Sequence, residues 1–194
     1  MIRARRLSRR FGQKRVLERL DLDLEEGGFL VVTGPNGSGK TTLLRLCAGL
    51  LAPTGGELRV EIDRGGIGFL AHEPLVYREL SALENLELFG RLYRVPERRE
   101  RTGMLLERFG LWNVRNERAG SFSRGMLQRL ALCRTFLHEP ELLLLDEPFN
   151  ALDAEGTELL ARELEELRPE RTFLVATHDP ERLSPLTTGS LTLA

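Results

Sequence analysis

A glycine-rich segment at residues 34–42 constrains the fold of this chain more than any other feature. It follows the apolar run at residues 29–32 and leads into the largely apolar residues 43–48, which gives the order strand, glycine loop, helix. Three glycines let the backbone bend so that successive N–H groups point inward, and the helix adds its positive N-terminal end. This order predicts a cradle for a polyphosphate. The segment reads Gly34, Pro35, Asn36, Gly37, Ser38, Gly39, Lys40, Thr41 and Thr42.

Two side chains at the end of this segment are expected to contact the phosphates and a metal ion. The pattern G-x-x-x-x-G-K-[ST] ends in Lys40 and Thr41, so Lys40 would sit between the β- and γ-phosphates and the Thr41 hydroxyl would bind Mg²⁺. Of the 28 Lys and Arg residues, only Lys14 and Lys40 are lysine. A compact ammonium fits a narrow loop as a point charge, which a planar guanidinium does less well.

Length and charge are those of one ordinary α/β domain. The 194 residues can bury a full core, and a formal net charge of -1 favours no polyanion, so we expect no nucleic-acid partner. The arginines near the N-terminus are interleaved with Leu7 and Phe11, which indicates the outer faces of a strand and turn. No segment approaches the roughly 18 apolar residues of a membrane span, and the start lacks a signal-peptide core. We therefore expect a soluble intracellular protein. Cys47 and Cys133 are expected to be buried free thiols.

The first part of the chain has the period of antiparallel strands and then that of helices. Residues 2–7 and 16–24 alternate apolar with polar side chains, and residues 58–62 alternate in the same way. From Ser81 the period becomes helical, and Ser81 with Glu84 forms a capping box. We expect a small helical subdomain, about residues 73–133, inserted in a single domain that spans residues 1–194.

The later part of the chain predicts a parallel sheet. Residues 141–146 are too apolar to alternate, which is typical of a strand covered on both faces. A helix follows at residues 153–167, and the acidic run at residues 155–170 predicts that its outer face is solvated. Residues 171–177 form the next buried strand. The core sheet is therefore expected to be mainly parallel.

Two carboxylates end the buried strand at residues 141–146. The carboxyl ends of parallel strands are where open α/β sheets bind ligands. Asp146 can hold Mg²⁺ through water, and Glu147 can accept a hydrogen bond from a water aligned with the γ-phosphate. Together with the glycine loop, this pair predicts a nucleotide hydrolase.

At this point the chain resembles the nucleotide-binding subunit of an ABC transporter, over nearly all of its length and with each family element in family order. The resemblance implies an ABC ATPase fold that binds ATP and Mg²⁺. It implies that Phe11 stacks on adenine and that residues 150–153 form the D-loop. His178, in the position of the switch histidine, would contact the γ-phosphate and hold Glu147 and water in line.

The chain departs from the family pattern at two places. The signature, usually Leu-Ser-Gly-Gly-Gln, reads Phe-Ser-Arg-Gly-Met at residues 122–126. Ser123 can still cap a helix that faces the γ-phosphate, and Gly125 still permits close backbone approach. His72 stands where the family has a glutamine that reaches Mg²⁺ and the attacking water. An imidazole can replace it only while neutral, so activity would fall as pH decreases.

The resemblance also implies partners. Two copies would pair head to tail, with each ATP between Lys40 of one copy and Ser123 of the other. Transport would need separate membrane permease subunits, docked around residues 72–93, and would place the chain as a peripheral protein at the cytoplasmic face of the inner or plasma membrane.

Within the family, the chain is most similar to the ATPase of the cytochrome c maturation system, the haem exporter. That group often has histidine at the glutamine position. Residues 72–74, 80–86 and 123–126 carry this likeness. Three alternatives stay open: the ATPase of a drug or lipid efflux transporter, a soluble ABC ATPase of a non-transport machine, and a small P-loop kinase.

Overall fold

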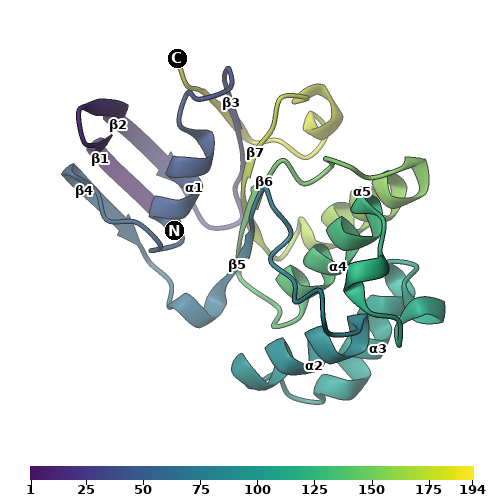
Figure 1. Cartoon of the computed structure of the whole chain (residues 1–194). Helices are drawn as coiled ribbons and strands as arrows, with labels where there is room; N and C mark the ends of the chain where they lie inside the picture. Colours follow the sequence, from purple (N-terminus) through teal and green to yellow (C-terminus); the bar gives the residue numbers. More distant parts are fainter.

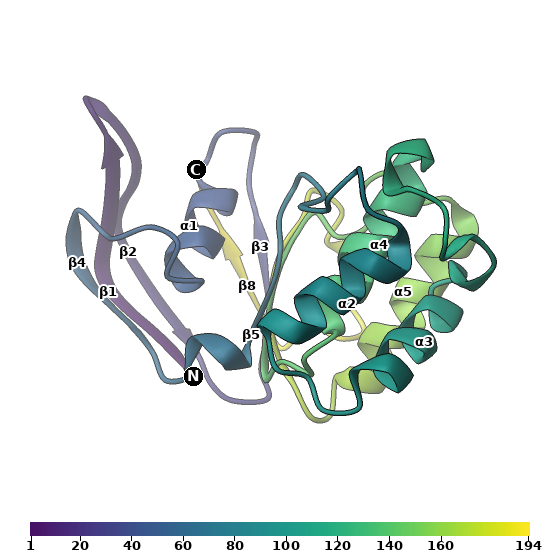
Figure 2. The same ribbon diagram turned by 60° about the horizontal axis from the view of Figure 1, so that its bottom comes forward.

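The computed structural model describes residues 1–194. Its strands form a three-stranded antiparallel sheet in the order β2-β1-β4 and a five-stranded parallel sheet in the order β5-β6-β7-β3-β8. One helix, α1, lies between the two sheets, and α2 to α5 gather on the other side of the parallel sheet (Figure 1 and Figure 2). The strands are β1 Ile2–Phe11, β2 Lys14–Leu24, β3 Phe29–Thr33, β4 Gly55–Val60, β5 Ile67–Leu70, β6 Leu142–Asp146, β7 Thr172–Ala176 and β8 Gly189–Thr192. The helices are α1 Lys40–Cys47, α2 Ala82–Leu92, α3 Arg98–Arg108, α4 Arg124–Phe136 and α5 Ala154–Leu167, with short 3₁₀ turns at Arg64–Gly66, Trp112–Val114, Ala119–Ser121 and Glu181–Leu183.

The antiparallel sheet is longer than the alternation of its sequence predicts. Strand β1 continues past Leu7. Its pairing with β2 is irregular between Ala4 and Leu7 and again between Leu7 and Arg9, and the backbone hydrogen bonds between the two strands continue after each irregularity. Strand β4 begins at Gly55, opposite Ser8, rather than at residue 58. Sequence alternation is interrupted at such bulges, so it does not reveal where a strand ends.

The central strands of the parallel sheet are buried on both faces, as their apolar sequences predict. All residues of β6 and β7 are buried. In β6, Leu142 and Leu144 belong to the core shared with α1 and the antiparallel sheet, whereas Leu143 and Leu145 belong to the core under α2 to α5. Both cysteines are free and buried, which confirms that expectation. None of the helices combines the length and the apolar composition needed to cross a membrane.

Helix boundaries follow from local capping. The Glu84 N–H donates to Ser81 Oγ at 3.1 Å, and the Ser81 N–H donates to Glu84 Oε2 at 2.8 Å, so the predicted capping box is confirmed. Asp153 caps α5 through a 2.8 Å bond that its Oδ1 accepts from the Gly156 N–H. These bonds satisfy backbone donors that have no partner within the helix.

The acidic run of α5 is not a uniformly solvated face, which corrects the sequence expectation. Glu163 is only 2% exposed, and its Oε2 accepts a 2.7 Å hydrogen bond from the Arg108 guanidinium of α3. The guanidinium of Arg108 compensates the buried carboxylate. The sequence pattern of α5 alone contains no information about which distant side chain pairs with Glu163.

Candidate active site

The glycine loop connects β3 to α1 with a backbone that only glycine adopts without strain. Gly34 has φ +144°, and a Cβ there would lie 2.4 Å from the Leu193 carbonyl oxygen. Gly39, the residue that precedes α1, has φ +105°, and its Cβ would lie 2.8 Å from the Leu17 side chain. The glycines of the motif therefore serve both the turn and the close approach of neighbouring strands.

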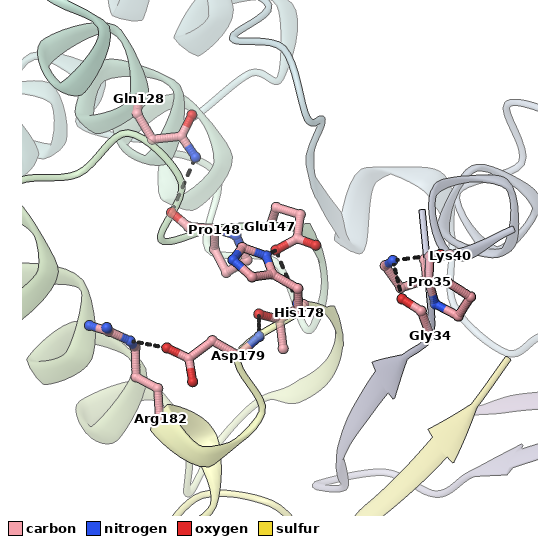
Figure 3. A network of polar contacts seen from close by, with 10 residues as sticks. Gly34, Pro35, Lys40, Gln128, Glu147, Pro148, His178, Asp179 and Arg182 are labelled. Carbon is pink, nitrogen blue, oxygen red and sulfur yellow. Dashed lines mark hydrogen bonds and ion pairs between the residues drawn. The ribbon is translucent and has the colours of Figure 1, made fainter. Parts of the chain in front are cut away.

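Lys40 folds back over the loop. Its Nζ donates to the Gly34 carbonyl at 2.7 Å and to the Pro35 carbonyl at 3.3 Å, and the side chain is buried (Figure 3). A cavity of about 350 Å³ opens beside it. The cavity is lined by Lys14, Val16, Asn36, Gly37, Gly39, Lys40, Thr41, Thr42, His72, Asp146 and Glu147. The fold thus brings most of the predicted phosphate and metal residues into one space.

Thr41 and Asp146 form the polar pair of this cavity. The Thr41 hydroxyl donates to Asp146 Oδ2 at 2.7 Å, and Asp146 is only 1% exposed. Burial raises the pKa of Asp146, and the hydrogen bond from Thr41 opposes that rise. A hydroxyl and a carboxylate side by side are hard oxygen ligands of the kind that Mg²⁺ prefers, so the donor set fits this ion.

Glu147 and His178 form a second pair. His178 Nδ1 lies 2.8 Å from Glu147 Oε2, and the His178 backbone N–H donates to the same oxygen at 3.3 Å (Figure 3). Glu147 is nearly buried and has φ +50°, an unfavourable conformation for a residue with a side chain. Such conformations concentrate at functional sites, where the surroundings hold them in place. His178 does not line the cavity itself and reaches it through Glu147.

Comparison with known proteins identifies the family. The family model described as ABC transporter matches residues 17–150. The ABC transporter ATP-binding protein NatA of Bacillus subtilis is 34% identical over 197 residues, a match that covers 92% of this chain and 80% of NatA. This chain belongs to the ABC transporter ATP-binding family. It spans only part of several curated relatives: 62% of YxlF of Bacillus subtilis (35% identical, 92% of this chain) and 50% of the daunorubicin resistance protein DrrA3 of Streptomyces coeruleorubidus (40% identical, 76% of this chain).

Solved structures of the family share the fold. An ATP-binding subunit of an ABC transporter matches with a TM-score of 0.91 and 26% identity, over 99% of this chain and 85% of that one. The ATP-binding cassette MJ0796, solved as a dimer in a post-hydrolysis state bound to ADP and Pi, matches with a TM-score of 0.84 and 28% identity, over 100% of this chain and 94% of that one. The predicted fold class, a P-loop ABC ATPase with a parallel core sheet and an antiparallel sheet, is confirmed.

Two residues of this ABC domain line the cavity without having been predicted. Lys14 and Val16 of β2 stand beside the glycine loop, whereas Phe11, predicted to stack on adenine, does not line the cavity. Phe11 is 45% exposed, and the guanidinium of Arg9 lies over its ring at 4.5 Å from the centroid. A signal for Lys14 was present in the sequence, because it is one of only two lysines in a chain that otherwise uses arginine.

The predicted signature residues lie outside the phosphate cavity. Ser123 caps α4 through a 3.2 Å bond that its Oγ accepts from the Met126 N–H. A Cβ on Gly125 would lie 2.9 Å from the Ala151 carbonyl oxygen, so glycine is needed where α4 meets the loop after β6. Within one copy, therefore, Ser123 and Gly125 are not brought to the cavity of Lys40.

A buried amide supports the loop that carries Glu147. Gln128 of α4 is 3% exposed, and its Nε2 donates to the Pro148 carbonyl at 3.1 Å (Figure 3). This bond ties the signature helix to the residue directly after Glu147. A glutamine within an apolar helical stretch was the only sequence sign of it.

Proposed function

We propose that this chain binds ATP with Mg²⁺ and hydrolyses it to ADP and phosphate as the ATP-binding subunit of an ABC transporter. The observation that carries the proposal is the single cavity shared by the glycine loop, the Thr41–Asp146 pair and Glu147. Backbone N–H groups and the Lys40 ammonium provide donors for a triphosphate. In this proposal residues 1–194 form one nucleotide-binding domain with a helical subdomain at about residues 73–133.

Each side chain of the cavity has a distinct part in the proposed reaction. Thr41 and Asp146 would hold Mg²⁺, which when bound neutralises charge on the phosphate oxygens. Glu147 accepts a proton from a water whose oxygen attacks the γ-phosphorus, and the bond to the β–γ bridging oxygen breaks with its electron pair left on ADP. His178 holds the Glu147 carboxylate through the 2.8 Å contact.

His72 is included in the proposal because it lines the same cavity as Thr41 and Asp146. Its imidazole would take the place of the family's glutamine beside the metal and the attacking water. His72→Gln should keep the ATPase rate within about threefold, because the amide can also donate and accept, whereas His72→Ala should lower it about tenfold. Equal ATPase rates for wild type and His72→Ala would show that His72 has no part in the reaction.

Two copies are proposed to enclose ATP between them. Ser123 and Gly125 lie outside the cavity of their own copy, and MJ0796, a cassette of the same fold, is dimeric. Glu147→Gln should therefore bind ATP, fail to hydrolyse it and elute as an ATP-dependent dimer. Glu158→Gln on the exposed side of α5 is the matched control and should remain active. A Glu147→Gln protein that stays monomeric with ATP would contradict the paired arrangement.

A permease partner is proposed to dock along residues 72–93, with the chain held at the cytoplasmic face of the membrane. Four large apolar or aromatic side chains in this stretch are exposed: Leu75 (52%), Tyr77 (51%), Leu92 (65%) and Tyr93 (44%). The ring of Phe89 lies 6.0 Å from that of Tyr77 and 6.3 Å from that of Tyr93, and exposed apolar side chains grouped in this way are typical of an interaction surface. Recovery of the chain with host membranes would support this placement, and exclusively cytosolic recovery would favour a non-transport ABC ATPase.

For the cargo, we propose haem export in cytochrome c biogenesis, on the basis of residues 72–74, 80–86 and 123–126. The alternative is drug or lipid efflux, which the likeness to the daunorubicin resistance protein favours. Other relatives are named for import of sulfate or of spermidine and putrescine, so similarity to an ATP-binding subunit does not by itself select the cargo. Purification of the native complex and identification of its membrane subunit would decide between these cargoes.

The basic activity is tested by release of phosphate from ATP labelled at the γ-position. All label should appear as free phosphate, which would exclude a kinase, and release should require Mg²⁺. Lys40→Ala should weaken ATP binding itself, because in this proposal the ammonium is a main donor to the phosphates. A folded wild-type protein that neither binds nor hydrolyses ATP with Mg²⁺ would refute the proposed function.

A further inference from the structure

A second polar cavity lies on the antiparallel sheet, apart from the nucleotide cavity. Its volume is about 510 Å³, and its lining residues are Ser8, Arg10, Arg15, Leu17, Glu18, Arg19, Thr54 and Gly55. No residue lines both cavities. Along β2, Lys14 and Val16 line the nucleotide cavity, whereas Arg15, Leu17, Glu18 and Arg19 line the second one. Strand β2 therefore borders both cavities.

Positive charge in the second cavity is only partly compensated. The Arg15 guanidinium pairs with Glu18 at 2.9 Å, but the side chains of Arg10 and Arg19 make neither an ion pair nor a hydrogen bond. The same strands do pair other arginines, such as Arg5 with Asp23 at 2.9 Å. Two guanidinium groups without a partner leave this concavity with a net positive charge, which an anion would neutralise.

The backbone around the cavity is held in an unfavourable conformation. Arg6 on β1 and Arg19 on β2 have φ +47° and +48°, where residues with a Cβ are disfavoured. They lie where the pairing of β1 with β2 is irregular, and the Arg19 N–H donates to Ser8 Oγ at 3.0 Å. Bulges of this kind re-aim side chains, and such strain is typically retained where it serves a function.

The free donors of the cavity are guanidinium groups rather than hydroxyls. Ser8 Oγ already accepts from Arg19 and donates to the Arg6 carbonyl, and Thr54 Oγ1 accepts from the Arg10 N–H and donates to the Ser8 carbonyl. A planar guanidinium matches two oxygens of a phosphate group at once. A site whose free donors are all guanidinium groups fits a small, doubly charged phosphate better than a long polymer.

We infer that this cavity binds a phosphomonoester between Arg10 and Arg19, independently of ATP in the other cavity. The phosphate can belong to a soluble metabolite or to phosphatidic acid in a membrane, since both are phosphomonoesters with three terminal oxygens. The inference does not depend on the proposed ATPase activity.

The test uses two probes that share this phosphate group. Binding of glycerol 3-phosphate is measured by calorimetry on the Lys40→Ala protein, which disables the nucleotide cavity, and flotation is measured with phosphatidylcholine vesicles with and without phosphatidic acid. Arg10→Gln/Arg19→Gln is compared with Arg59→Gln/Arg162→Gln, which removes the same charge from side chains that are 76% and 71% exposed and line neither cavity.

The first double variant should weaken binding at least about tenfold, while the control stays within about twofold of wild type. If the first double variant loses only its binding of glycerol 3-phosphate, the ligand is a soluble one. If it loses only its binding to vesicles with phosphatidic acid, the ligand is a lipid headgroup. Equal losses in both variants, or no binding of either probe, would overturn the inference. If circular dichroism shows that the glutamine variant is unfolded, Arg10→Lys/Arg19→Lys is used in its place. Unchanged phosphate binding in that variant would overturn recognition by the planar guanidinium groups.

Discussion

Replacing His178 by Ala tests whether this histidine acts on the proposed reaction through Glu147. The alanine removes the 2.8 Å ring contact to Glu147 Oε2 and keeps the 3.3 Å backbone bond to the same oxygen. A hydrogen bond to a charged group contributes about 1.5–3 kcal/mol. The ring is 67% exposed, which places the loss at the lower end. About 1.5–2 kcal/mol corresponds to a fall in kcat of roughly 10- to 30-fold.

The assay is steady-state phosphate release at saturating ATP and Mg²⁺, with ATP affinity measured separately. Affinity should change by less than about threefold, because Lys40 and the glycine loop are untouched. Glu147→Gln should lower kcat by about 10²- to 10⁴-fold, the usual value of a general base. His178→Gln should recover part of the lost rate, because its amide can donate to the same carboxylate oxygen.

A double variant provides the decisive comparison. If the ring acts only by holding the carboxylate, His178→Ala should slow Glu147→Gln no further, because the charged acceptor is already gone. A double variant slower than Glu147→Gln by the full factor seen for His178→Ala alone would show that the histidine acts on the nucleotide directly. That result would refute the positioning role derived from the contact.

Three further predictions concern buried groups outside the cavity. Arg108→Met should lower the free energy of unfolding by about 2–4 kcal/mol, because it leaves the buried Glu163 carboxylate unpaired. Glu166→Gln, which removes an exposed partner, should cost less than about 0.5 kcal/mol, and equal losses in urea titrations would contradict this account. Burial lowers the pKa of His138, so the unfolded chain binds the proton more readily and the free energy of unfolding should fall as pH decreases below about 6.5. His138→Asn should make this decrease at acid pH less steep. An unchanged decrease would show that His138 is not its cause. Burial raises the pKa of Cys47 to about 12, so maleimide labelling at pH 7.5 should be far slower in the native than in the unfolded protein, and rapid native labelling would contradict the burial.

Sequence patterns predicted the elements that depend on neighbouring residues. The glycine loop, the Ser81–Glu84 capping box and the buried strand that ends at Asp146 could all be located. Each follows from backbone sterics, hydrogen bonding within a few residues or the period of apolar side chains. The ends of strands could not be located in this way, because bulges such as those between Ala4 and Arg9 interrupt the alternation without ending the strand.

The sequence by itself determined which side chains could bind phosphate and metal, and in which order along the chain they occur. Only the tertiary structure decided which of them meet. Thr41 and Asp146 are 105 residues apart, and the order of the parallel strands places them 2.7 Å from each other. The same holds for the pairing of Glu163 with Arg108 of α3 and for the cavity that is lined by both Arg19 of β2 and Gly55 of β4. Periodicity fixes the face on which a residue stands, whereas register and helix packing, which involve distant segments, fix what that face contacts.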